Sequence, residues 1–322
     1  LDTVFEVDDG FQAYAREGNI ATGPGIDDMK SGDVVIVYAL KALQAVGVLD
    51  GMQIIAFYTG DEEFAGRPLS ISRRDLIESG KWADVALGFE AGQHFDRTDW
   101  ATVARRGASG WRLEVTGRQA HSSQVFSEEV GAGAIFEVAR ILNAFYDRVR
   151  GEEYLTFNAG AILGGTTVEY DYELNRGTAF GKTNVVPNTV VVHGGIRTIS
   201  PEQLERAQEG MLSVIVNSLP HTTATLTFDE GYPAMAPTAG NMVLQEMFSE
   251  INEALGRGPM LALDPLKRGA ADISFVAPYA DALAGLGGLG KGGHSPNESF
   301  EINSMSLAVK RAAILMYRLS NQ

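Results

Sequence analysis

The first hundred residues contain one long apolar segment and two short ones. Residues 33–47 are apolar nearly all round and end in Gly47, which predicts a buried helix. Residues 52–59 and 85–89 are short apolar runs, typical of strands that are covered on both faces. A helix followed by buried strands favours an α/β sheet for this part of the chain.

The hydrophobic pattern changes near residue 104. Trp111, Leu113 and Val115 alternate with polar residues, which predicts a strand with one solvent-facing side. The next segments are predicted as helix, strand, strand, helix and strand, at residues 128–149, 155–163, 189–199, 200–219 and 222–228. The second of these helices begins with Ser200 as N-cap and Pro201 in its first position. The order β-α-β-β-α-β is the ferredoxin-like pattern.

Residues 104–231 are therefore expected to form an inserted domain. Residues 232–322 carry two further helical patterns, at 240–256 and 303–320. We expect them to rejoin residues 1–103 in a first domain. The chain opens with Leu1-Asp2-Thr3-Val4-Phe5, which has the pattern of a buried strand's end and no signal sequence, so we expect that it begins within a domain.

The amino-acid composition excludes several kinds of metal site, catalysis and binding partner. The 322 residues include no cysteine, so any metal must be held by His, Asp or Glu, and disulfides and thiolate catalysis are excluded. The net charge is −15, and no basic stretch is interleaved with aromatic residues, which argues against nucleic acid as a partner. No apolar run reaches 18 residues, so we expect no membrane-spanning segment.

Acidic and imidazole groups concentrate in four short segments. Asp27 and Asp28 precede the first predicted helix, residues 61–63 (Asp-Glu-Glu) follow an apolar strand, Glu90 follows another, and His294 follows a glycine-rich stretch. Each has an ordinary explanation, namely a helix cap, a solvated loop, a loop charge or a structural histidine. Acids at the carboxyl end of buried strands also lie where α/β proteins bind ligands.

Taken together and in order, these segments resemble the two-zinc hydrolases of the glutamate carboxypeptidase, acetylornithine deacetylase, succinyl-diaminopimelate desuccinylase and aminoacylase type. Leu1-Asp2-Thr3-Val4 resembles the end of the family's His-x-Asp-Thr/Val motif, and Asp28-Met29-Lys30-Ser31-Gly32 resembles its Asp-Met-Lys-Gly-Gly. The later motifs are matched by Asp61-Glu62-Glu63, Phe89-Glu90 and Gly293-His294-Ser295-Pro296-Asn297-Glu298. The resemblance covers essentially the whole chain.

The resemblance implies roles for these residues. Asp28 would bridge two zinc ions, Glu63 and His294 would complete one site, and Glu90 with a further histidine would complete the other. Glu62 would be the general base that takes a proton from the metal-bound water and passes it to the leaving amine. Asp2 would orient the further histidine, which would stand before Leu1 and is absent from this sequence.

One of the two zinc sites is therefore expected to be impaired in this chain. Cobalt or manganese could bind the same kinds of ligand.

The inserted domain carries family signals as well. His121, in Gly117-Arg118-Gln119-Ala120-His121, would reach the partner subunit's active site and stabilise the oxyanion. Asn184 and Arg197 would bind substrate, with Arg197 pairing with a carboxylate, and Gly269 lies in a loop that would line the carboxylate pocket. A homodimer through residues 104–231 is implied. His94, His193 and His221 fall outside these motifs and are expected to be structural or at the surface.

The resemblance implies a zinc-exopeptidase catalytic domain, with a central mixed sheet flanked by helices, and an inserted ferredoxin-like α+β lid. The expected activity is hydrolysis of an amide bond next to a free carboxylate, as in glutamate carboxypeptidases, with a small peptide as substrate. One alternative is a deacylase of N-acyl amino acids, and another is a catalytically silent relative that acts as a binding module. Cytoplasmic, periplasmic and secreted locations all stay open.

Overall fold

The computed structural model describes residues 2–172 and 174–321 and divides into two compact units. Unit 1 comprises residues 1–105 and 234–322, and unit 2 comprises residues 106–233. Each boundary lies two residues from the one expected from sequence. Leu1, the first residue of the proposed N-terminal motif, lies outside the described residues.

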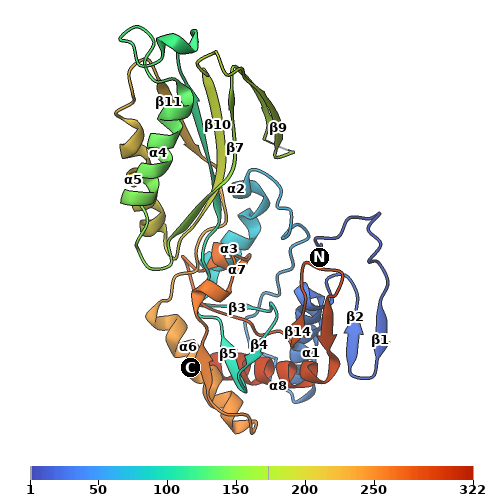
Figure 1. Cartoon of the computed structure of the whole chain (residues 1–322). Coiled ribbons are helices and arrows are strands. Elements are labelled where there is room, and N and C mark those ends of the chain that lie inside the picture. The colour runs from blue at the N-terminus through green and yellow to red at the C-terminus, as the bar shows by residue number, and fades with distance from the viewer. Residues whose placement is uncertain (1, 173, 322) are drawn as a thin grey trace. The chain divides into compact units, whose positions relative to one another are not determined.

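Unit 2 has the expected β-α-β-β-α-β order (Figure 1). Its elements are β6 (Ser109–Thr116), α4 (Ala134–Arg148), β7 (Thr156–Gly165), β10 (Thr189–Arg197), α5 (Pro201–Ile215) and β11 (Thr223–Phe228), together with the short helix η2 (Ser122–Gln124). The sheet order is β11-β6-β10-β7, and every neighbouring pair is antiparallel. This is the ferredoxin-like arrangement, and it confirms the prediction.

The core of unit 2 lies between this sheet and the two helices on one of its faces. Trp111, Leu113 and Val115, which alternate along β6, are fully buried there, as the sequence pattern predicts. The Ser200 side chain accepts a hydrogen bond from the Gln203 N–H and caps α5.

A hairpin in unit 2 was not foreseen from the sequence. It consists of β8 (Thr167–Asp171) and β9 (Arg176–Phe180). The Tyr172 hydroxyl donates a hydrogen bond of 2.8 Å to Glu114, and the Arg112 guanidinium lies 4.3 Å from the centre of the Tyr172 ring. The hairpin therefore packs against the polar face of β6. Its strands are short and largely exposed, so they carry no clear apolar alternation that would reveal them.

Unit 1 is a mixed α/β structure, which confirms the predicted class. Its helices are η1 (Ile26–Lys30), α1 (Ser31–Ala45), α2 (Leu69–Ser72), α3 (Arg74–Trp82), α6 (Ala239–Ala254), η3 (Pro265–Lys267), α7 (Ile273–Val276) and α8 (Ile302–Leu319). Its strands are β1 (Ala15–Glu17), β2 (Ile20–Thr22), β3 (Val85–Gly88), β4 (Gln93–Phe95), β5 (Thr98–Ala101), β12 (Met260–Ala262), β13 (Asp281–Ala284), β14 (Gly290–Lys291) and β15 (Ser299–Glu301).

The strands of unit 1 form small sheets rather than one continuous sheet. β3 pairs with β13 in parallel, and β5 pairs with β12 in parallel and with β4 antiparallel. A single bridge, Thr102 to Ala284, connects these two groups. The third group, β1-β2-β15-β14, brings the His294 region next to the N-terminal segment.

The strand predicted at residues 52–59 is wrong. No strand among residues 2–172 and 174–321 pairs with this segment, and a strand needs a neighbour to satisfy its backbone hydrogen bonds. Its apolar side chains are not covered on both faces, since Ile55 is 49% exposed and Phe57 is 37% exposed. Together with β3, the segment lines a cavity of about 660 Å³ whose lining also includes Asp28, Glu62 and Glu63.

The position of the first predicted helix is confirmed, but the helix is less buried than predicted. It forms α1, and Val35, Ile36 and Ala39 on its inner face are covered. On the opposite face, Val37 is 46% and Tyr38 is 53% exposed. Among the described residues nothing covers that face, so α1 is buried on one side only, although its sequence is apolar nearly all round. None of the helices in residues 2–172 and 174–321 is long and apolar enough to cross a membrane.

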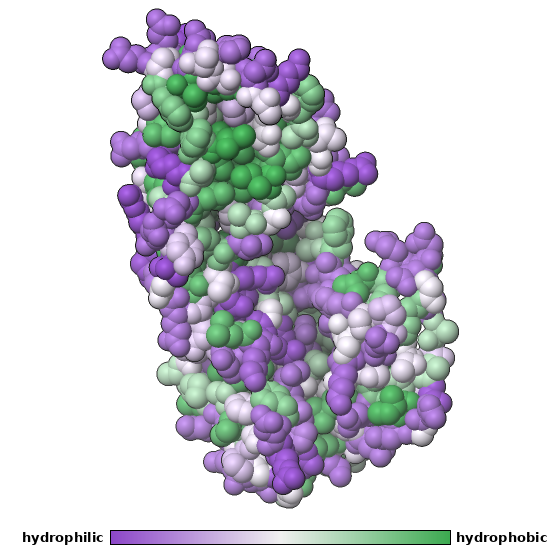
Figure 2. Space-filling model, in the orientation of Figure 1, coloured by the Kyte–Doolittle hydropathy of each residue, from purple (hydrophilic) through white to green (hydrophobic). Residues whose placement is uncertain are grey.

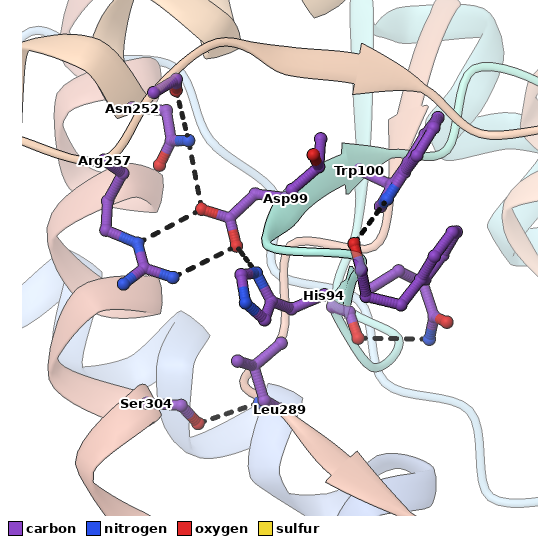
Figure 3. A network of polar contacts seen from close by, with 12 residues as sticks. His94, Asp99, Trp100, Asn252, Arg257, Leu289 and Ser304 are labelled. Carbon is purple, nitrogen blue, oxygen red and sulfur yellow. Dashed lines mark hydrogen bonds and ion pairs between the residues drawn. The ribbon is translucent and has the colours of Figure 1, made fainter.

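A buried polar network fastens unit 1 together (Figure 3). Asp99 on β5 accepts hydrogen bonds from Arg311 on α8, from Asn252 on α6 and from Arg257, and His94 lies 2.7 Å from its other oxygen. Burial opposes ionisation of Asp99, yet the bonds from Arg257 and the charge of Arg311 prevail and lower its pKa to about 2. His94 thus has a structural position.

Candidate metal centre

The loop before α1 presents Asp28. Gly25 begins this loop with a φ of 68°, a conformation that favours glycine. The Lys30 ammonium donates a hydrogen bond of 2.8 Å to the Pro24 carbonyl and closes the loop. Asp28 is half-buried and lines the cavity described above.

Asp28, Glu63 and His294 come together from three distant parts of the sequence. His294 Nε2 lies 3.1 Å from Asp28 Oδ2 and 3.2 Å from Glu63 Oε2. One ligand atom from each residue falls within 4.8 Å of the others. Two carboxylates and one imidazole are a donor set that suits zinc and related divalent ions. The arrangement therefore fits a metal ion held by these residues.

The electrostatics of this group also fit a cation. Burial, followed by the negative charge of Glu90, raises the pKa of Asp28. Burial and the charge of Asp28 raise the pKa of Glu63 to about 7. Ionised carboxylates at this spacing repel each other, and a divalent cation between them would offset that repulsion.

Glu62 faces the same acidic space. Burial, and then the charge of Glu90, raise its pKa to about 8. Its backbone is held by Asp2, whose carboxylate accepts the N–H of Glu62 at 3.0 Å and that of Glu63 at 2.9 Å. In this structure Asp2 thus fixes the loop that carries the candidate base. The role implied for it, orienting a histidine before Leu1, has no partner among the described residues.

Arg73, a residue that the sequence analysis did not identify, fixes the same loop from the other side. It is fully buried and donates to the Asp61 carboxylate and backbone carbonyl, both at 2.7 Å. It also donates to Asp272 at 2.8 Å. The sequence around Arg73 resembles that of any surface arginine. Only the structure, in which Arg73 lies between α2 and α3 beside two acids, reveals its role.

Glu90 is not part of the Asp28–Glu63–His294 group. Its Oε2 pairs with the buried guanidinium of Arg105 at 3.2 Å. A second arginine, Arg268, lies close enough to Arg105 and Glu90 to interact with their charges. Burial and the charge of Arg105 lower the pKa of Arg268 to about 10, and the charge of Glu90 opposes this shift. A Cβ on Gly32 would lie 1.9 Å from the Phe89 carbonyl, so glycine lets α1 approach the segment that carries Glu90.

Gly269 is exposed, and its part in the described structure is through its backbone. Its carbonyl accepts a hydrogen bond of 3.3 Å from Arg105, next to the Ala270 carbonyl at 3.2 Å. No heavy atom lies within 4 Å of the position that a Cβ would take there. Neither observation gives Gly269 a direct binding role.

The candidate residues of unit 2 fall into two places. His121 forms a bridge with Val185, and the Asn184 carbonyl accepts the Ser122 N–H at 2.9 Å, so His121 and Asn184 lie together beyond the Thr189 end of β10. Arg197 lies at the other end of β10. At about 3.4 Å per residue, the two ends are about 27 Å apart. All three side chains belong to exposed residues.

Comparisons with known proteins find related sequences and folds. The sequence profile of Peptidase family M20/M25/M40 matches residues 1–318. Carboxypeptidase G2 of Pseudomonas sp. (strain RS-16) is 25% identical over 284 residues, which is 86% of this chain. The chain spans 62% of the length of that relative.

Solved structures show the same fold. A tripeptidase from Staphylococcus aureus matches with a TM-score of 0.67 at 19% identity, over 96% of this chain and 77% of that one. An M20 family metallo-carboxypeptidase from Sulfolobus solfataricus matches with a TM-score of 0.63 at 16% identity, over 96% and 79%. At these identities the likeness establishes the fold alone.

Proposed function

The chain belongs to Peptidase family M20/M25/M40, and from that premise we propose that it is a metal-dependent hydrolase of an amide bond next to a free carboxylate. The observation that carries the proposal is the convergence of Asp28, Glu63 and His294 on one point, with Glu62 facing the same acidic space. Acids so placed are costly for the fold unless they bind a cation, which is the reason to assign them to function.

Asp28, Glu63 and His294 would hold the ion, which we propose to be zinc, with cobalt and manganese as alternatives. When bound, a zinc ion polarises the substrate carbonyl and makes water a stronger nucleophile. Glu62 would act as the general base and accept a proton from the attacking water. Its raised pKa suits this task because an efficient base has a pKa near the working pH. The same carboxylic acid would then deliver that proton to the leaving amine.

The substrate is proposed to be a small peptide or conjugate that ends in a free carboxylate. Arg197 is suited to pair with that carboxylate through two hydrogen bonds, and Asn184 offers an amide for the substrate backbone. The similarity to carboxypeptidase G2 favours a carboxypeptidase over a deacylase of N-acyl amino acids. The resemblance of the sequence motifs to glutamate carboxypeptidases favours a glutamate-type conjugate. A deacylase of N-acyl amino acids would use the same residues and is the second candidate.

Zinc-loaded protein should be assayed on amide conjugates of glutamate beside N-acetyl amino acids. We expect a higher kcat/KM on the glutamate conjugates. Glu62→Gln should lower kcat by about 10²–10⁴-fold, because the base is lost, while zinc binding is retained. Zinc-loaded wild-type protein that hydrolyses neither class would contradict the proposal and favour a binding module. Equal activity of Glu62→Gln would remove Glu62 from the mechanism.

We further propose that this chain holds one metal ion tightly. The second site would need Glu90, and Glu90 is paired with Arg105. Because a guanidinium already neutralises that carboxylate, a second cation would have to displace it. Elemental analysis after dialysis should give close to one zinc per chain, and Arg105→Met should raise the weak second binding. Two tightly held ions in the wild-type chain would disprove this.

A homodimer formed through unit 2 is also proposed. The exposed apolar side chains of this unit include Phe126 (67%), Ile135 (47%), Phe136 (54%) and Ile162 (57%). Figure 2 shows apolar residues gathered on this unit between the positions of α4 and β7 in Figure 1. β7 is an edge strand of the sheet, with unpaired backbone groups available to another copy.

The placement of the candidate residues supports the same idea. His121 with Asn184, and Arg197, lie at opposite ends of one sheet. A single copy of unit 2 cannot bring both ends to one substrate. Two copies in a symmetric dimer could each supply a different end.

A further inference from the structure

We propose that Glu298 is the positioning residue that joins the loop of Asp28 to the loop of His294 and thereby sets the geometry of the metal centre. The inference rests on the proposed function, because it concerns the same group of metal-binding side chains. Glu298 lies in the last of the sequence motifs, yet neither its position nor its residue type assigns it a role there. The role comes from its contacts.

The Glu298 carboxylate is buried inside the Asp28 loop. Glu298 is 1% exposed. Its Oε2 accepts the N–H of Gly25 at 2.8 Å, and its Oε1 accepts the N–H groups of Asp27 at 2.8 Å and Asp28 at 2.9 Å. One side chain thus binds three backbone groups of a loop about 270 residues away in sequence, including the N–H of Asp28 itself.

The other end of Glu298 belongs to the His294 turn. The Glu298 N–H donates to the Ser295 carbonyl at 3.0 Å, and the Ser295 N–H donates to the Gly292 carbonyl at 3.0 Å. Within this turn His294 has a φ of 63°, which a non-glycine residue adopts only where its surroundings enforce it. The turn therefore holds His294 at a fixed place relative to Glu298.

These contacts make Glu298 a short connection between two ligands of one ion. Asp28 and His294 approach to 3.1 Å, and the Glu298 carboxylate links the backbones from which they project. A buried carboxylate is expensive unless its oxygens are satisfied, and three charge-assisted hydrogen bonds supply that here. Residues that orient ligands in this way commonly change metal affinity by 10–100-fold when they are replaced.

The charge of Glu298 acts in the same direction. Its Oε1 lies 2.8 Å from the backbone nitrogen of Asp27 and 2.9 Å from that of Asp28, so its negative charge lies close to the metal centre. A carboxylate that binds backbone N–H groups with both oxygens is occupied as an acceptor and contributes negative potential without serving as a ligand. A cation at Asp28 would be attracted by this potential, so Glu298 is expected to favour metal binding by position and by charge.

The test compares Glu298→Gln with Glu301→Gln, which removes the same charge three residues away at the end of β15. Zinc affinity is measured by competition with a chromophoric chelator, and the visible spectrum of the Co²⁺-loaded protein reports ligand geometry. We expect Glu298→Gln to weaken zinc binding by about 10–100-fold and to alter the Co²⁺ spectrum. Glu301→Gln should leave both within about twofold of wild type.

A purely structural role would lower the melting temperature of the metal-free protein and leave the Co²⁺ spectrum of the folded fraction unchanged. That result, or unchanged zinc affinity in Glu298→Gln, overturns the proposal while the proposed hydrolase stands. Glu298→Asp keeps the charge and shortens the reach, so it should show intermediate affinity. If both Glu298 variants fail to fold, the residue is structural and the proposal fails. A wild-type chain that binds no zinc overturns the proposed function as well.

Discussion

At the scale of single residues, the site is built from carboxylates that the fold alone would not favour. Glu62, Glu63, Asp27 and Asp28 lie at least partly buried near one another, and burial raises the pKa of each. The nearby cations do not cancel this, since Arg105 is engaged with Glu90 and Arg73 with Asp61. The metal-free protein therefore keeps protons at this site that an unfolded chain would release.

This gives a prediction for the pH dependence of stability. Glu62 has a folded-state pKa of about 8 against an ordinary 4.5, and Asp27 about 7 against 3.8. A raised acid pKa stabilises the folded state below the unfolded pKa, and that stabilisation is lost as pH rises through the folded pKa. The melting temperature of metal-free protein should fall between pH 5.5 and pH 8. Asp99, whose pKa is lowered, acts only below about pH 4 and does not affect this window.

Zinc should reverse the trend, because its ligands must lose their protons to bind. Saturating zinc is expected to raise the melting temperature more at pH 8 than at pH 5.5. Glu62→Gln should flatten the slope of the metal-free protein, since the substituted group does not titrate. A metal-free melting temperature that rises from pH 5.5 to pH 8 would show that these acids do not govern stability there.

At the scale of elements, the hydrophobic pattern located most α-helices and the four strands of the main sheet of unit 2, but not the β8–β9 hairpin. Trp111, Leu113 and Val115 alternate with polar residues and are all buried on one face of β6, so the alternation correctly indicates a strand with one buried side. Residues 52–59 show the opposite case. Their apolar run indicates a buried strand, but a strand exists only where a neighbour pairs with it, and no described strand does so. Local sequence cannot supply that neighbour.

The Asp99 network belongs to the same scale, because it fastens β5 to α6 and α8. Arg311→Met should destabilise the protein by about 3–5 kcal/mol, since it removes a buried cation from a buried carboxylate. Urea unfolding of the metal-free protein measures this. As a matched control, Arg318→Met breaks the exposed pair with Glu250 on the same helix and should cost less than about 1 kcal/mol. Equal losses in the two variants would refute a special role for Asp99.

At the scale of the whole molecule, the apolar patch of unit 2 predicts self-association. Gly164 lies against Ile135 of α4, and Ile162, two residues earlier on β7, faces the same side. Ile162→Asp would place a charge in the proposed interface and should give monomers in light scattering after size-exclusion chromatography. Val216→Asp, an equally drastic change at the end of α5, should leave the dimer intact. Monomeric wild-type protein at micromolar concentration would contradict the dimer.

The sequence by itself determined the fold class, the inserted ferredoxin-like order and the residue types available for a metal, because periodicity and composition are local properties. It also singled out Asp28, Glu63 and His294 through their motifs. Only the tertiary structure decided that His294 lies within 3.2 Å of both Asp28 and Glu63, that Glu90 pairs with Arg105, and that Glu298 joins two loops. Such contacts depend on where distant segments of the chain come to lie, and no local pattern records that.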